Sequence, residues 1–430
     1  MDSVTHESTQ QMLRPGHCVD LAYPNPDTSK KQCFRTTVNT RYATALTNLA
    51  SGVSQFTISP SNGVGDILLI LRFPSSTEST ATGNAIPLGW GFQAIKNISF
   101  RCAGDSQYFL TGQQLMIHAL DNCSDAQARD SLFSLAGSLC KVVGDFTDSN
   151  FAYVYLKTPW SHPSAEGKQP ALPTDLLSMQ VLVTVELNPI STYCSTNGGT
   201  TPASLKSGQF VVQQVQFQNQ GDSLARRVDM TTHSLAYGIG FAQQASQISF
   251  TNIGSGVYNA SLQGFRSGEC TAIYLWLTMA DDTANAGYLS PLQTYRPQDV
   301  VVTYMGNVYA NYPNDSGALW NLINGKLVPE VANTLITGYA SSAYTTSALA
   351  SKWVRIPFAQ SNDPGASNSE MLVSGLEITN GQVQVQFTLP LNCRVTPGTT
   401  NARTGPVFLN YFAEYNATWI FGSGTASLAF

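Results

Sequence analysis

The side chains best suited to acid–base catalysis or metal binding are few and widely separated in this sequence. Histidine titrates near neutral pH and is a common zinc ligand, yet the chain has only five. No HExxH pair occurs, and the adjacent His17-Cys18 cannot by itself build a tetrahedral site. His118 lies in a short apolar segment, where we expect it to be packed or to cap a helix. The five histidines are His6, His17, His118, His162 and His233.

Glycine motifs that would bind nucleotides are incomplete. Three glycine pairs begin like a dinucleotide-binding loop, but each lacks the third glycine of GxGxxG, and we interpret them as turns between strands. Gly325-Lys326 resembles the end of a P-loop, yet Trp320 stands where the first glycine is required and Leu327 replaces Ser/Thr. A GxSxG nucleophile motif is also missing. The three glycine pairs are Gly63-Val-Gly65, Gly238-Ile-Gly240 and Gly422-Ser-Gly424.

Two charged pairs are further candidates for a chemical site. Asp281-Asp282 could bind a hard cation, but a solvated loop after a strand is the better interpretation. Arg226-Arg227 could touch an anion, but we expect this pair to form salt bridges across a hinge between domains. The sequence therefore predicts no catalytic, cofactor-binding or metal-binding residue, no cofactor, and a protein that is not an enzyme.

The composition favours a β-rich protein with a neutral polar surface. Charged residues make up 11% of the 430 residues, whereas about 25% is usual in soluble domains. Aromatic residues reach 10%, which excludes intrinsic disorder, and helical bundles need more Glu, Lys and Arg on their surfaces. Interfaces between subunits are depleted of Lys and Glu. The composition therefore suits a chain that buries much of its surface against other copies.

Charge and cysteine usage restrict the partners and the compartment. The net charge is −5 and basic residues do not cluster, so we expect no direct contact with nucleic acid. No apolar run approaches the roughly 18 residues of a membrane span, and the polar, acidic start of the chain is not typical of a secretory signal. Without any CxxC pair, the cysteines predict reduced thiols in a protein made in the cytosol, several of them in the core. The eight cysteines are Cys18, Cys33, Cys102, Cys123, Cys140, Cys194, Cys270 and Cys393.

Apolar and polar residues alternate with a period of two along the whole chain, which predicts strands with one buried face. Segments 181–187 and 382–389 are the clearest cases. In 211–217, the apolar set that we expect in the core begins at Val211, and Gln214 lies on the opposite face. Helical patterns are short, so the chain is mostly β. The predicted helices are 112–120, 125–139 and 317–323.

The second half of the sequence repeats the pattern of the first. In each half an apolar strand precedes a polar loop, a second strand, a turn with glycine and a short helix. About 200 residues per half are enough to close a core. We therefore predict two copies of one β-domain, with a boundary near 222–225. The offsets between equivalent landmarks are 205 (Leu68 to Ile273), 202 (Gly104 to Gly306) and 204 (Leu115 to Leu319).

Eight segments in order carry a resemblance to a known family. They are CFRTTVNTRYATA (33–45), FTISPSNGVGDILLILRFP (56–74), ISFRCAGDSQYFLTGQQL (98–115), VYLKTPW (154–160) with ALPTDLLSMQVLVTVEL (171–187), GDSLARRVD (221–229), FAQQASQISF (241–250), WVRIPFAQSNDPGASNSEMLVSGLEI (353–378) and YFAEYNATWIFGSGTASLAF (411–430). In this order the chain resembles the double jelly-roll major capsid proteins of nucleocytoplasmic large DNA viruses. Two motifs depart from the family pattern: the first turn is Gly-Asp, and Asp363–Ser367 replaces a Pro-Ser-Gly-type loop.

The resemblance implies an all-β fold of two tandem antiparallel eight-stranded jelly rolls with short helices in loops. The expected parts are an N-terminal arm (1–34), a first jelly roll (35–222) and a second (223–430). The implied function is that of a structural capsid protein, made and assembled in the host cytoplasm, whose pseudo-hexagonal trimers tile an icosahedral virion. Its implied partners are further copies in the homotrimer and neighbouring capsomers, minor capsid and penton proteins, and indirectly an internal membrane layer.

Two other functions are alternatives for a β-rich sequence of this composition. A tandem β-sandwich that binds glycans, such as an attachment protein, would stack loop aromatics such as Trp160, Tyr339 and Tyr344 on sugars. A β-sandwich hydrolase is disfavoured by the missing catalytic motifs. A trimer near three times 46.3 kDa would support the capsid interpretation, whereas a monomer that binds glycans would support the attachment protein.

The segments expected to make assembly contacts are long and poor in charge. Loops of a jelly roll are free to specialise, so we expect 121–150, 281–298 and 324–352 to face outward or pack between subunits. Deletion of Gly338–Ala348 should therefore weaken trimers and leave the β-content intact. We expect Met1–Lys31 to contact other proteins on the inner face of the shell; normal particle assembly without it would identify it as a tail.

Overall fold

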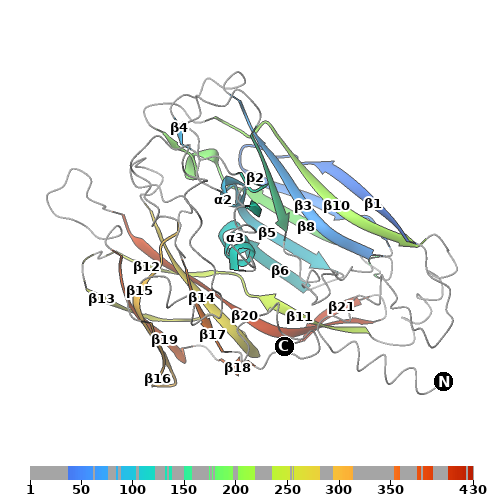
Figure 1. Ribbon diagram of the computed structural model, residues 1–430. Helices are drawn as coiled ribbons and strands as arrows, with labels where there is room; N and C mark the ends of the chain where they lie inside the picture. The colour runs from blue at the N-terminus through green and yellow to red at the C-terminus, as the bar shows by residue number, and fades with distance from the viewer. Residues whose placement is uncertain are drawn as a thin grey trace, which may run out of the picture.

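The structure of the chain is a computed structural model. It describes residues 37–61, 63–75, 84–85, 89–102, 106–121, 131–132, 135–137, 150–156, 174, 177, 180–196, 202–217, 235–251, 254, 256–280, 294–312, 353–358, 375–378, 381–390, 405–422 and 425–429. Figure 1 shows two bodies of strands side by side, one from each half of the chain. Every strand pair is antiparallel, and no helix in the described ranges is long and apolar enough to cross a membrane.

The first half forms two four-stranded sheets and one short pair of strands. One sheet has the order β1-β10-β3-β7 and the other the order β2-β8-β5-β6. Apart from the β5-β6 hairpin, strands that are neighbours in a sheet are distant in sequence, as in a jelly roll. The strands are β1 (Thr37–Ala45), β2 (Gly52–Ile58), β3 (Gly63–Phe73), β4 (Asn84–Ala85), β5 (Ile95–Cys102), β6 (Ser106–Thr111), β7 (Asn150–Leu156), β8 (Val181–Leu187), β9 (Ser195–Thr196) and β10 (Ser207–Phe217).

The second half repeats this arrangement. One sheet has the order β11-β20-β14-β17, with β12, β18 and β21 attached to it, and the other has the order β13-β19-β15-β16. The strands are β11 (Leu235–Ala242), β12 (Ser246–Phe250), β13 (Val257–Ser261), β14 (Glu269–Met279), β15 (Gln298–Tyr304), β16 (Asn307–Tyr312), β17 (Val354–Pro357), β18 (Leu376–Glu377), β19 (Val383–Thr388), β20 (Val407–Gly422) and β21 (Thr425–Ala429).

Strand register confirms that the two halves have one design. In the first half Leu69 pairs with Phe210 and Val154, and in the second Ile273 pairs with Ala413 and Ile356. All six side chains are buried, and the offsets between equivalent residues are 204, 203 and 202. The predicted fold of two tandem antiparallel jelly rolls is therefore confirmed. The boundary at 222–225 and the turn at Gly104 lie outside the described residues.

The alternation of apolar and polar residues predicts the core-facing side chains correctly in two strands and incorrectly in a third. Burial alternates along β8 and β19, as predicted. The prediction for β10 is wrong, because Phe210 and Val212 face the core and Val211 lies half-buried on the outer face. Phe210 stacks on Phe56 with 4.6 Å between ring centroids. Gln214 is buried on the same side, where its amide donates a hydrogen bond to the Ser59 carbonyl at 3.2 Å.

Helices are short and occur in connections: α2 (Trp90–Gln93), α3 (Gly112–Asp121) and a 3-10 turn, η4 (Ile190–Thr192). The predicted helix 112–120 is confirmed as α3, whereas 125–139 lies mostly and 317–323 entirely outside the described residues. Thr111 caps α3 by accepting from the Gln114 backbone at 3.2 Å, and the Gln114 side chain accepts from the Thr111 backbone at 3.0 Å. A side chain at Gly112 would overlap the carbonyl oxygens of Phe92 and Ile95, so the passage from β6 into α3 requires glycine.

The hairpin between β15 and β16 contains the turn that the repeat predicts at Gly306. Met305 and Gly306 both have positive φ angles, 49° and 82°. This is the backbone of a two-residue turn whose twist matches that of the flanking strands.

Candidate functional site

Helix α3 joins the two jelly rolls. It belongs to the first half, but Figure 1 shows it lying between the bodies, and its side chains contact strands of the second. Gln114 carries much of the connection. Its side-chain amide donates to the Gln243 carbonyl at 2.7 Å, and its oxygen accepts from the Ala245 backbone at 3.1 Å. Because the Gln114 side chain is fully buried and bonded at both ends, it fixes the helix against the segment between β11 and β12.

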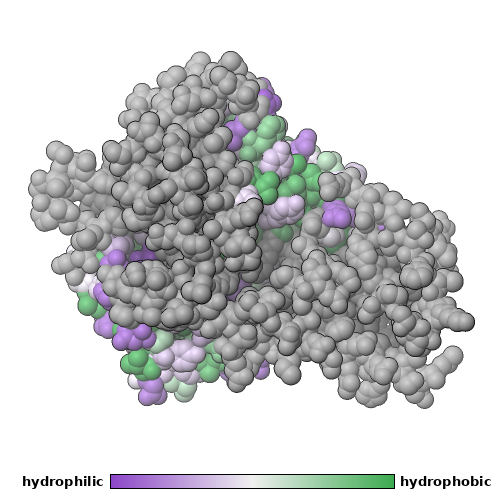
Figure 2. All heavy atoms as spheres, viewed as in Figure 1, coloured by the Kyte–Doolittle hydropathy of each residue, from purple (hydrophilic) through white to green (hydrophobic). Residues whose placement is uncertain are grey.

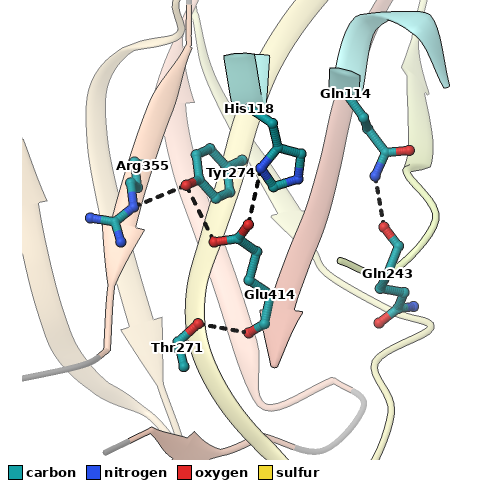
Figure 3. A network of polar contacts seen from close by, with 7 residues as sticks. All are labelled: Gln114, His118, Gln243, Thr271, Tyr274, Arg355 and Glu414. Carbon is teal, nitrogen blue, oxygen red and sulfur yellow. Dashed lines mark hydrogen bonds and ion pairs between the residues drawn. The ribbon is translucent and has the colours of Figure 1, made fainter. Parts of the chain in front are cut away.

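A charged network forms the centre of this junction (Figure 3). Nδ1 of His118 lies 3.0 Å from Oε1 of Glu414 on β20. The Tyr274 hydroxyl donates to Oε2 of the same carboxylate at 3.4 Å, and Nε of Arg355 donates to the Tyr274 hydroxyl at 3.1 Å. His118 is only 3% exposed, and its ring centroid lies 5.0 Å from that of Phe412. His118 is therefore a packed residue, as predicted.

Aromatic rings pack around the network. Phe412 stacks on Tyr274 with ring centroids 4.6 Å apart and meets Trp276 edge-on at 5.8 Å. The Trp276 indole donates to the Gln113 side chain on α3 at 3.0 Å. All of these rings belong to the outer face of the β11-β20-β14-β17 sheet, because the alternate residues of β14 fill the core. In the second jelly roll, this face is thus covered by the first.

A hollow of about 350 Å³ borders the junction. It contains no carboxylate, thiol or imidazole among its lining residues, and its one titratable group is Lys96. Nζ of Lys96 lies 2.7 Å from Glu186, and hydrogen bonds from Lys96 and Asn97 lower the Glu186 pKa. Apart from Lys96, the polar side chains of this lining are hydroxyls, amides and an indole, which can hold polar groups. The lining residues are Phe92, Gln93, Ile95, Lys96, Thr111, Gly112, Gln113, Asn188, Thr192, Ala245, Ser246, Gln247, Trp276 and Asn410.

Two of the three glycine motifs lie in strands, which corrects their interpretation as turns. Gly63-Val-Gly65 opens β3, and Gly238-Ile-Gly240 lies inside β11. A Cβ atom at Gly65 would contact Gln213, where the register of β10 shifts. Glycine within a strand commonly marks such an irregularity. The third motif stands between two strands, as predicted, because Gly422 ends β20 and pairs with Thr425, the first residue of β21. Gly424 is outside the described residues.

Most other candidates from the sequence lie outside the described residues. Within the described part of the chain, no group of three His, Cys, Asp or Glu side chains could hold a metal ion. The absence of a catalytic, cofactor or metal site from the whole chain stays a prediction. The candidates outside are His6, His17-Cys18, His162, His233, Arg226-Arg227, Asp281-Asp282, Gly325-Lys326, Trp160, Tyr339 and Tyr344.

Three of the eight cysteines can be placed, and all three are buried free thiols. Burial raises the pKa of Cys102 and Cys194 to about 12 each and also raises the pKa of Cys270. At neutral pH these thiols are protonated and unreactive. Their prediction as reduced core residues is confirmed.

Sequence reasoning missed Gln114 and Glu414, the residues that hold the junction together. Each leaves a signal in the sequence. Thr111 and Gln114 have the spacing of a capping box, and Glu414 interrupts the apolar strand segment Tyr411–Tyr415. An acidic residue in such a strand needs a partner when the strand is covered. The partner itself, His118, is 296 residues away, so no local pattern identifies it.

Comparison with solved structures finds double jelly-roll capsid proteins. VP54 of PBCV-1, in a crystal structure fitted into a reconstruction of the virophage Sputnik, has a TM-score of 0.62 and 12% identity over 93% of this chain and 98% of that one. The Faustovirus major capsid protein has a TM-score of 0.57 and 9% identity over 97% and 98%. A Sputnik virophage structure has a TM-score of 0.53 and 13% identity over 94% and 91%.

At these identities the similarity is one of fold. The chain has the double jelly-roll fold of viral major capsid proteins, which is the fold that its sequence resemblance predicts. Neither the known protein-family models nor the curated proteins give a match.

Proposed function

We propose that the protein is the major structural component of an icosahedral virus shell. Three copies form a capsomer in which six jelly rolls make a pseudo-hexagonal unit, and these units tile the facets. The observation that carries this proposal is that two jelly rolls of identical strand order are joined into one body by α3. Two similar rolls per chain allow three chains to present six similar edges to their neighbours.

Composition and chemistry support an assembly function. Only 11% of the residues are charged, which suits extensive contacts between subunits. The described junction pairs its histidine with its glutamate, and no carboxylate, thiol or imidazole lines the adjacent hollow. We extend the proposal to neighbouring capsomers, penton and minor capsid proteins as partners, with any internal membrane contacted only indirectly and the genome not contacted. The proposed location is the virion, after assembly in the host cytoplasm.

Size-exclusion chromatography with light scattering tests the proposal. The purified chain should elute with a mass near three times 46.3 kDa at micromolar concentration. A mass of one chain at every concentration would contradict the capsomer. A monomer that also binds glycans would instead favour the attachment-protein alternative.

A further inference from the structure

The outer face of the first jelly roll carries an exposed aromatic row. Phe151, Tyr153 and Tyr155 alternate along β7 and are 41%, 36% and 57% exposed. The residues between them point into the core. Leu68, Ile70 and Val211 continue the apolar surface across β3 and β10, each half-buried. We call these six residues the β7 face. Figure 2 shows apolar residues gathered on the surface where Figure 1 draws the strands of the first jelly roll.

The equivalent face of the second jelly roll is the one that α3 covers. Ile70 pairs with Tyr153 across the first sheet, and Tyr274 pairs with Arg355 at the equivalent place in the second. Tyr274 and Arg355 are 2% and 4% exposed, whereas Tyr153 is 36% exposed. One jelly roll thus has this face buried by its neighbour, and the other presents it to solvent. Since α3 follows the sixth strand of its own jelly roll and covers this face of the second, the duplication predicts that an equivalent helix covers the β7 face.

The second half contains the sequence equivalent of that helix. With the offset of 204, Leu319 is equivalent to Leu115 of α3, and Leu322 is equivalent to His118. The residue equivalent to Glu414 is Val211, at an offset of 203. The ion pair between His118 and Glu414 is therefore matched by two apolar residues in the other half. A pair of ionisable side chains in one half thus corresponds to a pair of apolar side chains in the other, as expected if Leu322 covers Val211.

We propose that the β7 face binds residues 313–352 of a second copy of the chain, with Leu322 against Val211. This contact repeats between chains the docking that α3 makes within one chain. The chain's own second jelly roll is already held on the α3 side of the first, so the occupant of the β7 face comes from another copy. A head-to-tail contact of this kind closes into a ring or continues as a filament. The inference rests on the proposed function, in which three chains close the ring.

A charge placed on the β7 face tests the contact. In the full-length chain, Val211→Glu buries an unpaired carboxylate at the proposed interface and should weaken trimers by about 100-fold or more. Light scattering should then report a mass near 46.3 kDa, with the circular dichroism spectrum of the parent. The double variant Val211→Glu/Leu322→Lys should recover the trimer, because the pair becomes the analogue of Glu414 with His118. Val308→Glu is the matched control, since Val308 is apolar and 67% exposed on β16, and it should leave the trimer intact.

Each outcome decides between the two proposals. A trimeric parent with a trimeric Val211→Glu variant would overturn the inference and leave the proposed function standing. A monomeric parent would overturn both. Dissociation by Val211→Glu without recovery in the double variant would show that Leu322 is not the contact. If Val211→Glu loses β-structure, Tyr155→Lys replaces it as the test variant. Tyr155 is 57% exposed, so its replacement leaves the core unchanged. A trimeric Tyr155→Lys variant would overturn the inference.

Discussion

Replacing His118 by alanine tests whether α3 holds the two jelly rolls together. The substitution removes a ring packed beside Phe412 and leaves the Glu414 carboxylate without its partner on α3. Breaking a buried ion pair from one side costs 3–5 kcal/mol, and we expect about 3 kcal/mol here. The lower end applies because the Glu414 side chain is 18% exposed and keeps the hydroxyl of Tyr274.

Calorimetry of the purified protein measures this cost. For a unit of about 200 residues, 1 kcal/mol shifts the melting temperature by about 2–4 °C, so His118→Ala should lower it by about 6–12 °C. Because the chain holds two jelly rolls, unfolding need not be two-state. We expect one transition for the parent, in which α3 couples the two jelly rolls, and two transitions for His118→Ala, in which that contact is lost.

The matched control is Lys96→Ala, which removes the ion pair between Lys96 and Glu186. Its N–O distance is shorter, 2.7 Å against 3.0 Å, but the Lys96 side chain is 52% exposed. An exposed pair contributes about 0–1 kcal/mol, so the melting temperature should fall by no more than about 4 °C. Two results would contradict the idea that burial makes the junction strong. One is an equal loss of unfolding free energy in Lys96→Ala and His118→Ala, and the other is a loss of less than about 1 kcal/mol in His118→Ala.

Three further predictions concern the turn into α3, the thiols and the genome. Gly112→Ala should lower the free energy of urea unfolding by several kcal/mol, because the new Cβ atom would clash with Phe92 and Ile95. The control Gly256→Ala has nothing near its Cβ position and should change this free energy by no more than about 0.5 kcal/mol. Equal effects of the two substitutions would contradict the clash. Alkylation mapped by mass spectrometry should leave Cys102 and Cys194 unmodified at pH 8 unless denaturant is added. Rapid alkylation of the native protein would refute the burial of these thiols. Since the pKa of each thiol is about 12 in the folded chain, the contribution of the two thiols to the free energy of unfolding should be complete below about pH 8.5 and be lost as the pH rises toward 12. In a filter-binding titration at about 150 mM salt, DNA should bind no tighter than micromolar, and submicromolar, salt-sensitive binding would disprove the absence of a genome contact.

The sequence predicts the strands well where one face alone is apolar. In β8 and β19 the polar residues stand opposite a continuous apolar set, so only one orientation buries a core. In β10, valines occupy both faces at Val211 and Val212, and the orientation depends on Phe210 stacking on Phe56 of the opposite sheet. That contact joins residues 154 positions apart and leaves no periodic signal in the sequence.

The duplication is predictable because its offset survives in the apolar strands and glycine turns. The junction is not predictable in the same way, because its partners come from different halves. His118 and Glu414 each have an ordinary local environment in the sequence, and their pairing depends on how α3 lies across β20. The glycine pairs of β3 and β11 favour turns when the sequence alone is considered. They lie instead in paired strands, because pairing with the neighbouring strand determines the backbone conformation there.

Electron microscopy of the purified full-length protein shows whether three chains form the proposed capsomer. The particles should have a pseudo-hexagonal outline in which class averages resolve six jelly-roll densities, two from each of three chains. Particles of a single chain, or assemblies with any other number of jelly rolls, would contradict it.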